Sequence, residues 1–296
     1  MPEPLYPNPK MLVRIAQGDA FAMAAEYITV PRDLKTWQAT LRFNRYVAHP
    51  RHHTVKPGHY TDDTQMSIAV AEALVADRPA DLRRHFADHF VRAFQRDPRE
   101  GYSRQFQTFL ESVKDTDDFL KRIVGGSEKN GAAMRSVPIG VLRDVEDVLA
   151  VAEVQGAVTH GGQGVWAAQA VACMSHFALY EDAPLKKMGS FCEGHLPGFK
   201  KTVGVTFGAP VEAPDLAKKT VAAAYHAIVH SDGMLDAMKD ILCWGGDTDT
   251  VGAIAWGIMS ARYPDEKLPT FFDEDLENGS YGRDFLLKLG QRLMKV

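Results

Sequence analysis

Apolar residues recur at helical spacing along almost the whole chain, and this feature most constrains the fold. The segment DLRRHFADHFVRAFQ (81–95) places Leu82, Phe86, Phe90 and Phe94 on one side of a helix, because residues three or four apart share a helix face. The pattern predicts an all-α protein. The same spacing recurs in the segments 66–77, 145–160, 163–180, 217–230 and 249–263.

One segment departs from the helical pattern. KTVGVTFGAPVEAP (201–214) looks extended, but its prolines and glycines suit a loop equally well. No long linker, internal repeat or low-complexity stretch interrupts the composition. Several of the expected helices are apolar on most faces, as the central helices of a large globule would be. We therefore expect one all-α domain over residues 1–296, a compact orthogonal bundle of many helices.

The composition excludes several classes of protein. The chain has 296 residues, of which 45% are hydrophobic and 24% charged, and its net charge of −4 gives no sign of general binding to nucleic acid. Cys173, Cys192 and Cys243 form no Cys-x-x-Cys pair, which argues against a disulfide framework or a zinc ribbon. The first residues have prolines where a signal peptide needs an apolar stretch, and no run of about 18 apolar residues could span a membrane. We expect a cytoplasmic protein without a membrane partner.

Two clusters of Thr and Asp each stand directly before an apolar helical segment. The first contains Thr61, Asp62, Asp63 and Thr64, and the second, 247–250, follows two glycines. Alone, each fits a helix start, because Thr and Asp are preferred caps and acids favour the first turn. Together they hold more carboxylates than caps need, and such groups repel one another unless a cation neutralises them. The pair therefore predicts two helix starts that face each other and hold two cations such as Mg²⁺ or Mn²⁺.

The second cluster also resembles two other acidic motifs. An EF-hand loop that began at Asp247 would need Glu at its twelfth position, where the chain has Ile258. The letters DTDTV also imitate the Asp-x-Asp signature of haloacid-dehalogenase phosphatases. In those enzymes the nucleophile follows a buried strand, whereas Gly245 and Gly246 precede it here. A metal-dependent phosphohydrolase that acts on a nucleotide stays open as a rival function.

Five ordered segments resemble motifs of the ADP-ribosylglycohydrolases, the family that includes the dinitrogenase reductase-activating glycohydrolase. YTDDTQMS and GGDTDTVGAIA resemble its two signature segments. RIAQGDAFAMAAE (14–26), KNGAAMRSVPIGVL (129–142) and VTHGGQGVWAAQAVA (158–172) resemble three further motifs. The resemblance runs across nearly the whole chain. It implies an all-α hydrolase that cleaves the glycosidic bond between ADP-ribose and an acceptor at a two-metal site.

The resemblance also implies roles for residues at the metals. Glu26 would be the acidic gate residue, and Asp63 or Asp247 would act as a general base toward water. Glu100 is a further candidate base, because some relatives carry an acid in the corresponding loop. Two Mg²⁺ or Mn²⁺ ions would be the cofactors. Their ligands would be Thr61, Asp62, Asp63, Asp247, Asp249 and Thr250.

Substrate contacts follow from the same resemblance. Ser127, Asn130 and Gly131 would contact ribose or phosphates, and His160 would line the cleft near the distal ribose or the diphosphate. The chain departs from some relatives directly before Asn130, where they carry an aromatic residue that stacks on adenine. Base stacking would then fall to another ring, for which the candidates are Tyr102, Phe106 and Phe191.

The acceptor is the least determined part of the expected substrate. By analogy with the short bacterial members, we expect ADP-ribosylated arginine on a protein. Serine-linked ADP-ribose, O-acetyl-ADP-ribose and ADP-ribosylated nucleic acid stay open, so nucleic acid is a partner only as a modified substrate. Two alternatives to this enzyme remain, a non-catalytic member that binds ADP-ribose and the nucleotide phosphohydrolase. All six expected ligand positions are filled, which favours the enzyme.

Overall fold

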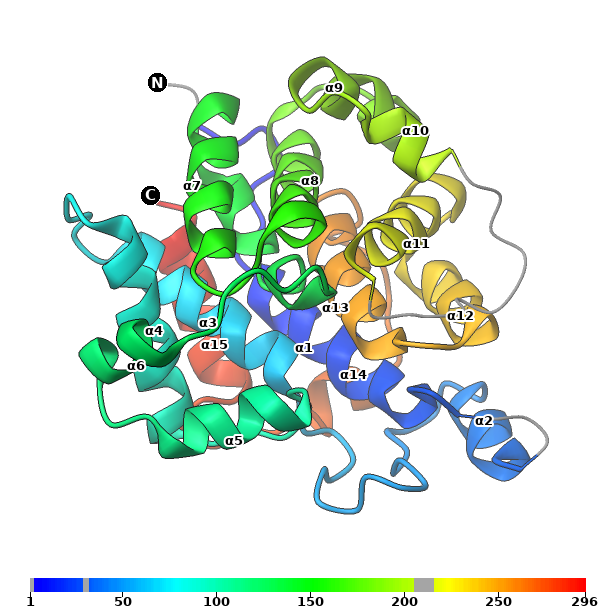
Figure 1. Cartoon of the computed structure of the whole chain (residues 1–296). Coiled ribbons are helices and arrows are strands. Elements are labelled where there is room, and N and C mark those ends of the chain that lie inside the picture. The colour runs from blue at the N-terminus through cyan, green and yellow to red at the C-terminus, as the bar shows by residue number, and fades with distance from the viewer. Residues whose placement is uncertain (1–2, 29–31, 205–215) are drawn as a thin grey trace.

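The computed structural model describes residues 3–28, 32–204 and 216–296, and these residues form an all-α fold (Figure 1). In this part of the chain, extended backbone pairs only at two isolated bridges, Ser127 with His160 and Lys129 with Leu216. The all-α prediction is confirmed. The longer α-helices are α1 (Met11–Ala22), α3 (Asp62–Val75), α4 (Leu82–Arg96), α5 (Arg104–Ser112), α7 (Val145–Ala157), α8 (Gly162–Tyr180), α9 (Met188–His195), α11 (Ala217–His230), α12 (Met234–Trp244), α13 (Thr248–Met259) and α15 (Arg283–Leu293). The short ones are α2 (Leu34–Thr40), α6 (Thr116–Arg122), α10 (Phe199–Val203) and α14 (Phe271–Glu274), with 3₁₀ turns η1 (Met23–Ala25), η2 (Asn130–Ala132), η3 (Val137–Val141) and η4 (Leu185–Lys187).

The segment 201–214, which the sequence left as either strand or loop, is only partly described. Its first three residues complete the short helix α10, which ends at Val203. Residues 205–214 lie outside the described residues. Among the helices that the structure describes, none is both long and apolar enough to cross a bilayer.

Helices α1 and α13 form the centre of the molecule and pack closely against each other (Figure 1). Every residue of both helices is buried. A Cβ atom added to Gly18 would lie 2.4 Å from the carbonyl oxygen of Gly252, so the two backbones touch where these glycines meet. This close approach places Asp19, the next residue of α1, beside the first turn of α13.

The apolar core consists of two clusters to which α3 and α8 both contribute. On α3, Ile68 and Ala71 belong to one cluster while Met66 and Val70 belong to the other. The larger cluster includes Trp256, which is fully buried and donates its indole N–H to the carbonyl oxygen of Met234 at 2.8 Å. Since α3 is packed on all sides, its first turn is held in a fixed position.

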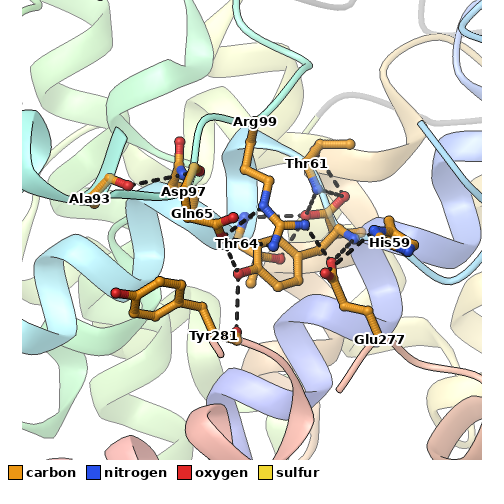
Figure 2. Close-up of polar contacts among 11 residues, drawn as sticks. His59, Thr61, Thr64, Gln65, Ala93, Asp97, Arg99, Glu277 and Tyr281 are labelled. Atoms are coloured by element: carbon orange, nitrogen blue, oxygen red, sulfur yellow. Dashed lines mark hydrogen bonds and ion pairs between the residues drawn. The ribbon is translucent and has the colours of Figure 1, made fainter. Parts of the chain in front are cut away.

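A polar network fixes the chain just before α3 (Figure 2). The carboxylate of Glu277 accepts hydrogen bonds from the backbone N–H of Tyr60, at 3.0 Å, and from the guanidinium of Arg99, at 2.5 Å. The Arg99 guanidinium also lies over the Tyr60 ring, 4.0 Å from its centroid. Gln65, in the first turns of α3, donates to the backbone carbonyls of Ala93 and Asp97. These contacts hold the first acidic segment against the rest of the fold.

Candidate functional site

The two acidic segments lie at helix starts, as predicted, but not as caps of their own helices. Thr61 and Asp247 are the N-cap residues of α3 and α13, and neither side chain accepts a hydrogen bond from its own helix. The Thr61 hydroxyl instead donates to Asp19 at 2.9 Å. The Asp247 carboxylate accepts a hydrogen bond from Nδ2 of Asn130 at 2.8 Å. The side chains of both segments are therefore available to a site between the helices.

Asp19 of α1 is a site residue that sequence reasoning missed. Its carboxylate accepts hydrogen bonds from the backbone N–H and the hydroxyl of Thr61, and from the same two groups of Thr64. Asp19 thus supplies the cap that α3 lacks from its own chain neighbours. The available signal was an acid in the middle of a largely apolar helix, directly after Gly18.

The carboxylates form two adjoining sets that could each hold a cation. Oxygens of Asp19, Asp63 and Asp249 lie within 4.8 Å of one another, and so do oxygens of Glu26, Asp247 and Asp249. Asp249 belongs to both sets. The first turns of α3 and α13 point their partial positive charge toward the cluster.

The cluster lacks positive charge of its own, and a divalent cation fits it. Oδ1 of Asp63 is sealed from solvent without a hydrogen-bond partner in the described part of the chain, although such buried oxygens are rarely left unsatisfied. Burial raises the pKa of Asp63 well above its usual value, and the neighbouring carboxylates of Asp62, Asp19 and Asp247 raise it further. Mg²⁺ and Mn²⁺ prefer such oxygen ligands, so these residues fit the cofactors that the sequence predicted.

The same causes act on the other acids of the cluster. Burial is the main reason why the pKa values of Asp62, Asp249 and Glu26 are raised well above their usual range, and nearby carboxylates add to it. For Asp19, burial raises the pKa to about 6 against the opposing hydrogen bonds from Thr64 and Thr61. Negative charge is thus disfavoured throughout the cluster until a cation binds.

Glu26 lies in the turn that follows η1, and hydrogen bonds with other segments hold this turn in place. The next residue, Tyr27, has a positive φ of 45° and donates its backbone N–H to the carbonyl oxygen of Gly246 at 2.8 Å. Nε2 of His49 lies 2.8 Å from the carbonyl oxygen of Glu26, and Arg51 donates to that of Tyr27 at 2.6 Å. The turn therefore presents Glu26 to the cluster while leaving its side chain 16% exposed.

The cluster forms one end of a cleft with a volume of about 790 Å³, a size typical of sites for small-molecule ligands. Asn130 and Gly131 of η2 line its wall beside the acids. Most of the residues predicted from the sequence meet in this cleft. Those that line it are Glu26, Asp62, Asp63, Tyr102, Phe106, Ser127, Asn130, Gly131, His160, Asp247, Asp249 and Thr250.

The structure does not bring the Glu100 side chain into this cleft. Glu100 is exposed and lines a separate cavity with Arg99 and Glu277. The cause is the turn at Gly101, where φ is +114° and an added Cβ atom would lie 2.0 Å from Oδ1 of Asp62. The Gly101 backbone therefore faces the acidic cluster, and among the described residues Glu100 is hydrogen-bonded to the cluster through its backbone carbonyl oxygen, which accepts the N–H of Asp62.

Three other candidates are more buried than the cleft lining or lie outside it. Thr61 is fully buried within the acidic cluster, where its hydroxyl is hydrogen-bonded to Asp19 and lies 3.4 Å from Asp63, and it does not line the cleft. Phe191 packs against Phe177 and His195 and is likewise absent from the lining. Tyr102 does line the cleft, but its ring is only 8% exposed and its hydroxyl donates to the side chain of Gln65.

The end of the cleft formed by α5 and the residues after α6 is apolar. Phe106 and Phe109 of α5 stack against each other, with ring centroids 5.9 Å apart. Ile123 and Val124 line the same region, and Val124 is 87% exposed. The guanidinium of Arg122 lies 5.4 Å from the centroid of Phe109. Only Phe106 of this group was a candidate from the sequence, because the others meet only when the loops fold.

Comparison with known proteins agrees with the fold. A family model described as ADP-ribosylglycohydrolase matches residues 11–296. The chain belongs to the ADP-ribosylglycohydrolase family. ADP-ribosylhydrolase ARH3 of Gallus gallus is 26% identical, with 74% of each chain covered. A solved structure titled ADP-ribosylglycohydrolase-related protein complex has a TM-score of 0.73 and 25% identity, and the match covers 97% of this chain and 96% of that one.

Membership of the ADP-ribosylglycohydrolase family confirms the resemblance of the five sequence segments. The interpretation of DTDTV as a haloacid-dehalogenase signature is wrong. Asp247 follows helix α12 rather than a strand, and Gly245 and Gly246 separate them with positive φ values of 69° and 81°. These two glycines turn the chain sharply so that Asp247 enters the cluster.

Proposed function

We propose that this chain hydrolyses the glycosidic bond between ADP-ribose and an acceptor with the help of two divalent cations, Mg²⁺ or Mn²⁺. The observation that carries the proposal is the sealed, unpartnered Oδ1 of Asp63 among further buried carboxylates. A buried cluster of this kind is costly without a counter-charge. It stands at one end of a cleft whose other end is aromatic, which suits a ligand with a polar ribose and an apolar base.

The proposed cation ligands combine the two acidic segments. Bound there, Mg²⁺ or Mn²⁺ supplies Lewis-acid chemistry, which polarises ribose oxygens and makes water more acidic. Asp19 positions the first segment through its bonds to Thr61 and Thr64. Asp249 belongs to both sets of oxygens and could therefore contribute an oxygen ligand to a cation held by either set. The proposed ligands are Thr61, Asp62, Asp63, Asp247, Asp249 and Thr250.

Among the candidate bases, we assign the proton transfer from water to Glu26. The Asp247 carboxylate is less available as a base, because Oδ2 accepts a hydrogen bond from Nδ2 of Asn130 at 2.8 Å and lies 3.5 Å from the Tyr27 hydroxyl. Asp63 is less available because it is buried inside the cluster. Glu26 lies on a separate turn with a partly exposed side chain. In the reaction, the water oxygen bonds to the anomeric carbon as the bond to the acceptor breaks. Glu26 takes one proton of the water and releases it to solvent, and the leaving acceptor takes up one proton from solvent, so that the water is divided between the two products and Glu26 is regenerated.

The charge of the cluster favours a cationic acceptor. Six carboxylates meet here, and two divalent cations would neutralise four of their charges. The remaining negative charge attracts a guanidinium group more strongly than a neutral hydroxyl. We therefore propose ADP-ribosylated arginine as the preferred substrate over serine-linked ADP-ribose, O-acetyl-ADP-ribose and ADP-ribosylated nucleic acid. The six carboxylates belong to Asp19, Glu26, Asp62, Asp63, Asp247 and Asp249.

Two variants test the proposal, together with a substrate panel of ADP-ribosylated arginine, serine-linked ADP-ribose, O-acetyl-ADP-ribose and ADP-ribosylated nucleic acid. Glu26→Gln should lower kcat on ADP-ribosyl-arginine by about 10²–10⁴-fold, the usual contribution of a general base, and should still bind Mn²⁺. Asp249→Asn should lose both turnover and Mn²⁺ binding, measured by calorimetry. Asp77→Asn, at an exposed position away from the cleft, is the matched control.

Each alternative function gives its own result in the same assays. A wild-type protein that binds ADP-ribose without releasing any acceptor from the panel would be a non-catalytic binding member. Release of inorganic phosphate instead of ADP-ribose would indicate the phosphohydrolase. Full activity of Asp249→Asn would refute the proposed site.

A further inference from the structure

Arg135 is a buried arginine in the wall of the cleft, and it has no acidic partner. Its side chain is only 1% exposed, and within the described ranges it forms no ion pair with a carboxylate. Its Nε donates to the side-chain oxygen of Gln155 at 2.8 Å, and its guanidinium lies 4.1 Å from the centroid of Phe90. One further N–H, at Nη2, donates to the hydroxyl oxygen of Thr159 at 2.8 Å. Arginine keeps its charge here and is only a donor.

The Thr159 hydroxyl links Arg135 to His160. It accepts a hydrogen bond from Arg135, and its oxygen lies 2.7 Å from Nδ1 of His160. In the part of the chain that the structure describes, no other acceptor for the hydroxyl hydrogen is found. Because the hydroxyl has a single hydrogen and already accepts the N–H of Arg135, the arrangement that pairs this hydrogen within the described residues has Thr159 donating to Nδ1. In that arrangement Nδ1 is an acceptor and the ring proton resides on Nε2.

The Nε2 edge of His160 is open to the cleft. Nε2 makes no hydrogen bond within residues 3–28, 32–204 and 216–296, and it is not among the atoms sealed from solvent. A Cβ atom on Gly131 would lie 3.2 Å from Nε2, and one on Gly164 would lie 2.9 Å from Cδ2, so the two backbones hold the ring. Burial, and next the charge of Arg135, lower the pKa of His160 to about 3. The ring is thus neutral at physiological pH.

We propose that Arg135 and Thr159 are positioning residues that fix His160 as a neutral donor with its proton on Nε2. The inference deepens the proposed function, on which it rests: the family resemblance already implies His160 near the ligand, and the structure adds the two residues that set which ring nitrogen faces it. The acceptor is an oxygen of either the diphosphate or the distal ribose, since both carry acceptors. In the histidine's other neutral form, Nε2 would present a lone pair and repel the same oxygen.

The first test examines the ring itself and requires no turnover. Nitrogen-15 correlation spectra of the wild-type protein should show His160 with a protonated Nε2 and an unprotonated Nδ1. Thr159→Val removes the hydroxyl at nearly constant volume and should abolish this preference. Thr159→Ser retains the hydroxyl and should keep it. A wild-type His160 with its proton on Nδ1, or with protons on both nitrogens, would overturn the proposal.

The second test measures affinity by calorimetry with Mg²⁺ present. Thr159→Val should weaken ADP-ribose binding about fivefold, the factor expected for one net hydrogen bond, and Thr159→Ser should bind normally. Thr116→Val is the control, because this substitution likewise removes a buried threonine hydroxyl. Thr116 donates its hydroxyl hydrogen to Asp88 and lies outside the cleft. An equal loss for ADP assigns the contact to the diphosphate, and a loss for ADP-ribose alone assigns it to the distal ribose.

The outcomes separate this inference from the proposed function. If Thr159→Val binds ADP-ribose as tightly as the wild type while its ring has lost the Nε2–H form, the inferred contact is wrong even where the enzyme turns over. If the wild type hydrolyses no ADP-ribosyl substrate but the spectra and affinities behave as expected, the proposed function fails and the contact stands. Should Thr159→Val not fold, the wild-type spectrum still decides the tautomer.

Discussion

Asp63→Asn gives the sharpest test of the cation site, because it changes charge at almost constant shape. Oδ1 of Asp63 has no hydrogen-bond partner in the described residues, and burial, followed by the surrounding carboxylates, raises the pKa of Asp63. An amide there removes one repelling charge and offers two N–H donors to Asp62 and Asp19. In EDTA, the variant should melt no lower than the wild type, which is unusual for a change at a fully buried polar residue.

The size of the cation effect follows from binding linkage. A cation present at 100 times its dissociation constant stabilises the folded state by about 2.7 kcal/mol. Unfolding entropy of about 2.1 cal/mol/K per residue gives about 0.6 kcal/mol/K for this chain, so the wild-type melting temperature should rise about 4 °C per bound ion. Asp63→Asn should lose most of this rise.

Differential scanning calorimetry with EDTA, Mg²⁺ or Mn²⁺ measures these shifts directly. The exposed Asp77→Asn variant is the control for loss of one carboxylate, and it should keep the full rise. Two results would refute the reasoning. One is a wild-type melting temperature that does not respond to either cation, and the other is an Asp63→Asn variant that responds as strongly as the wild type.

Three further predictions follow from the same structure. Without metal, the free energy of unfolding measured with urea should fall as the pH rises from 4 to 7, because burial raises the folded pKa of Asp19 to about 6 while the unfolded state releases this proton near 3.8. The loss is roughly 3 kcal/mol for this group. A free energy of unfolding that rises over this range would contradict the prediction. Gly101→Ala, with a Cβ 2.0 Å from the Asp62 carboxylate, should reduce the Mn²⁺-induced rise in melting temperature, while Gly279→Ala, with open space around it, should not. Phe109→Leu should weaken ADP-ribose binding in calorimetry about fivefold, through lost stacking, and leave the response to Mn²⁺ unchanged; an unchanged affinity would place the base elsewhere.

Local signals were sufficient for the fold class and for both halves of the acidic cluster. Helical periodicity predicted the helices because each needs only residues three or four apart. The segments 61–64 and 247–250 were found because each carries several acids and hydroxyls before an apolar run. Their meeting was inferred from charge, since together the two segments carry more carboxylates than helix caps need, and a cation would neutralise the excess.

Features that depend on distant contacts were missed or wrong. Asp19 is one of three polar residues with long or charged side chains in α1, beside Arg14 and Gln17, and its role arises because Gly18 and Gly252 let α1 and α13 touch. Glu100 was predicted as a base, but the positive φ of Gly101 turns its side chain away. A one-residue turn decides which side chain enters a cleft, and residue type does not reveal it.

The cleft buries charge of both signs without pairing the charges with each other. The carboxylate cluster at one end has no cationic side chain as an ion-pair partner except at Glu26, and Arg135 in the wall has no acid, within the described residues. A protein selected only for stability would have paired or removed such groups, because buried unpaired charge is destabilising. Under the proposed function, divalent cations would neutralise the acids, and the negative charge of the ligand's diphosphate would offset that of Arg135. The opposite charges in one cleft are therefore what the proposed function requires, an anionic nucleotide bound together with divalent cations.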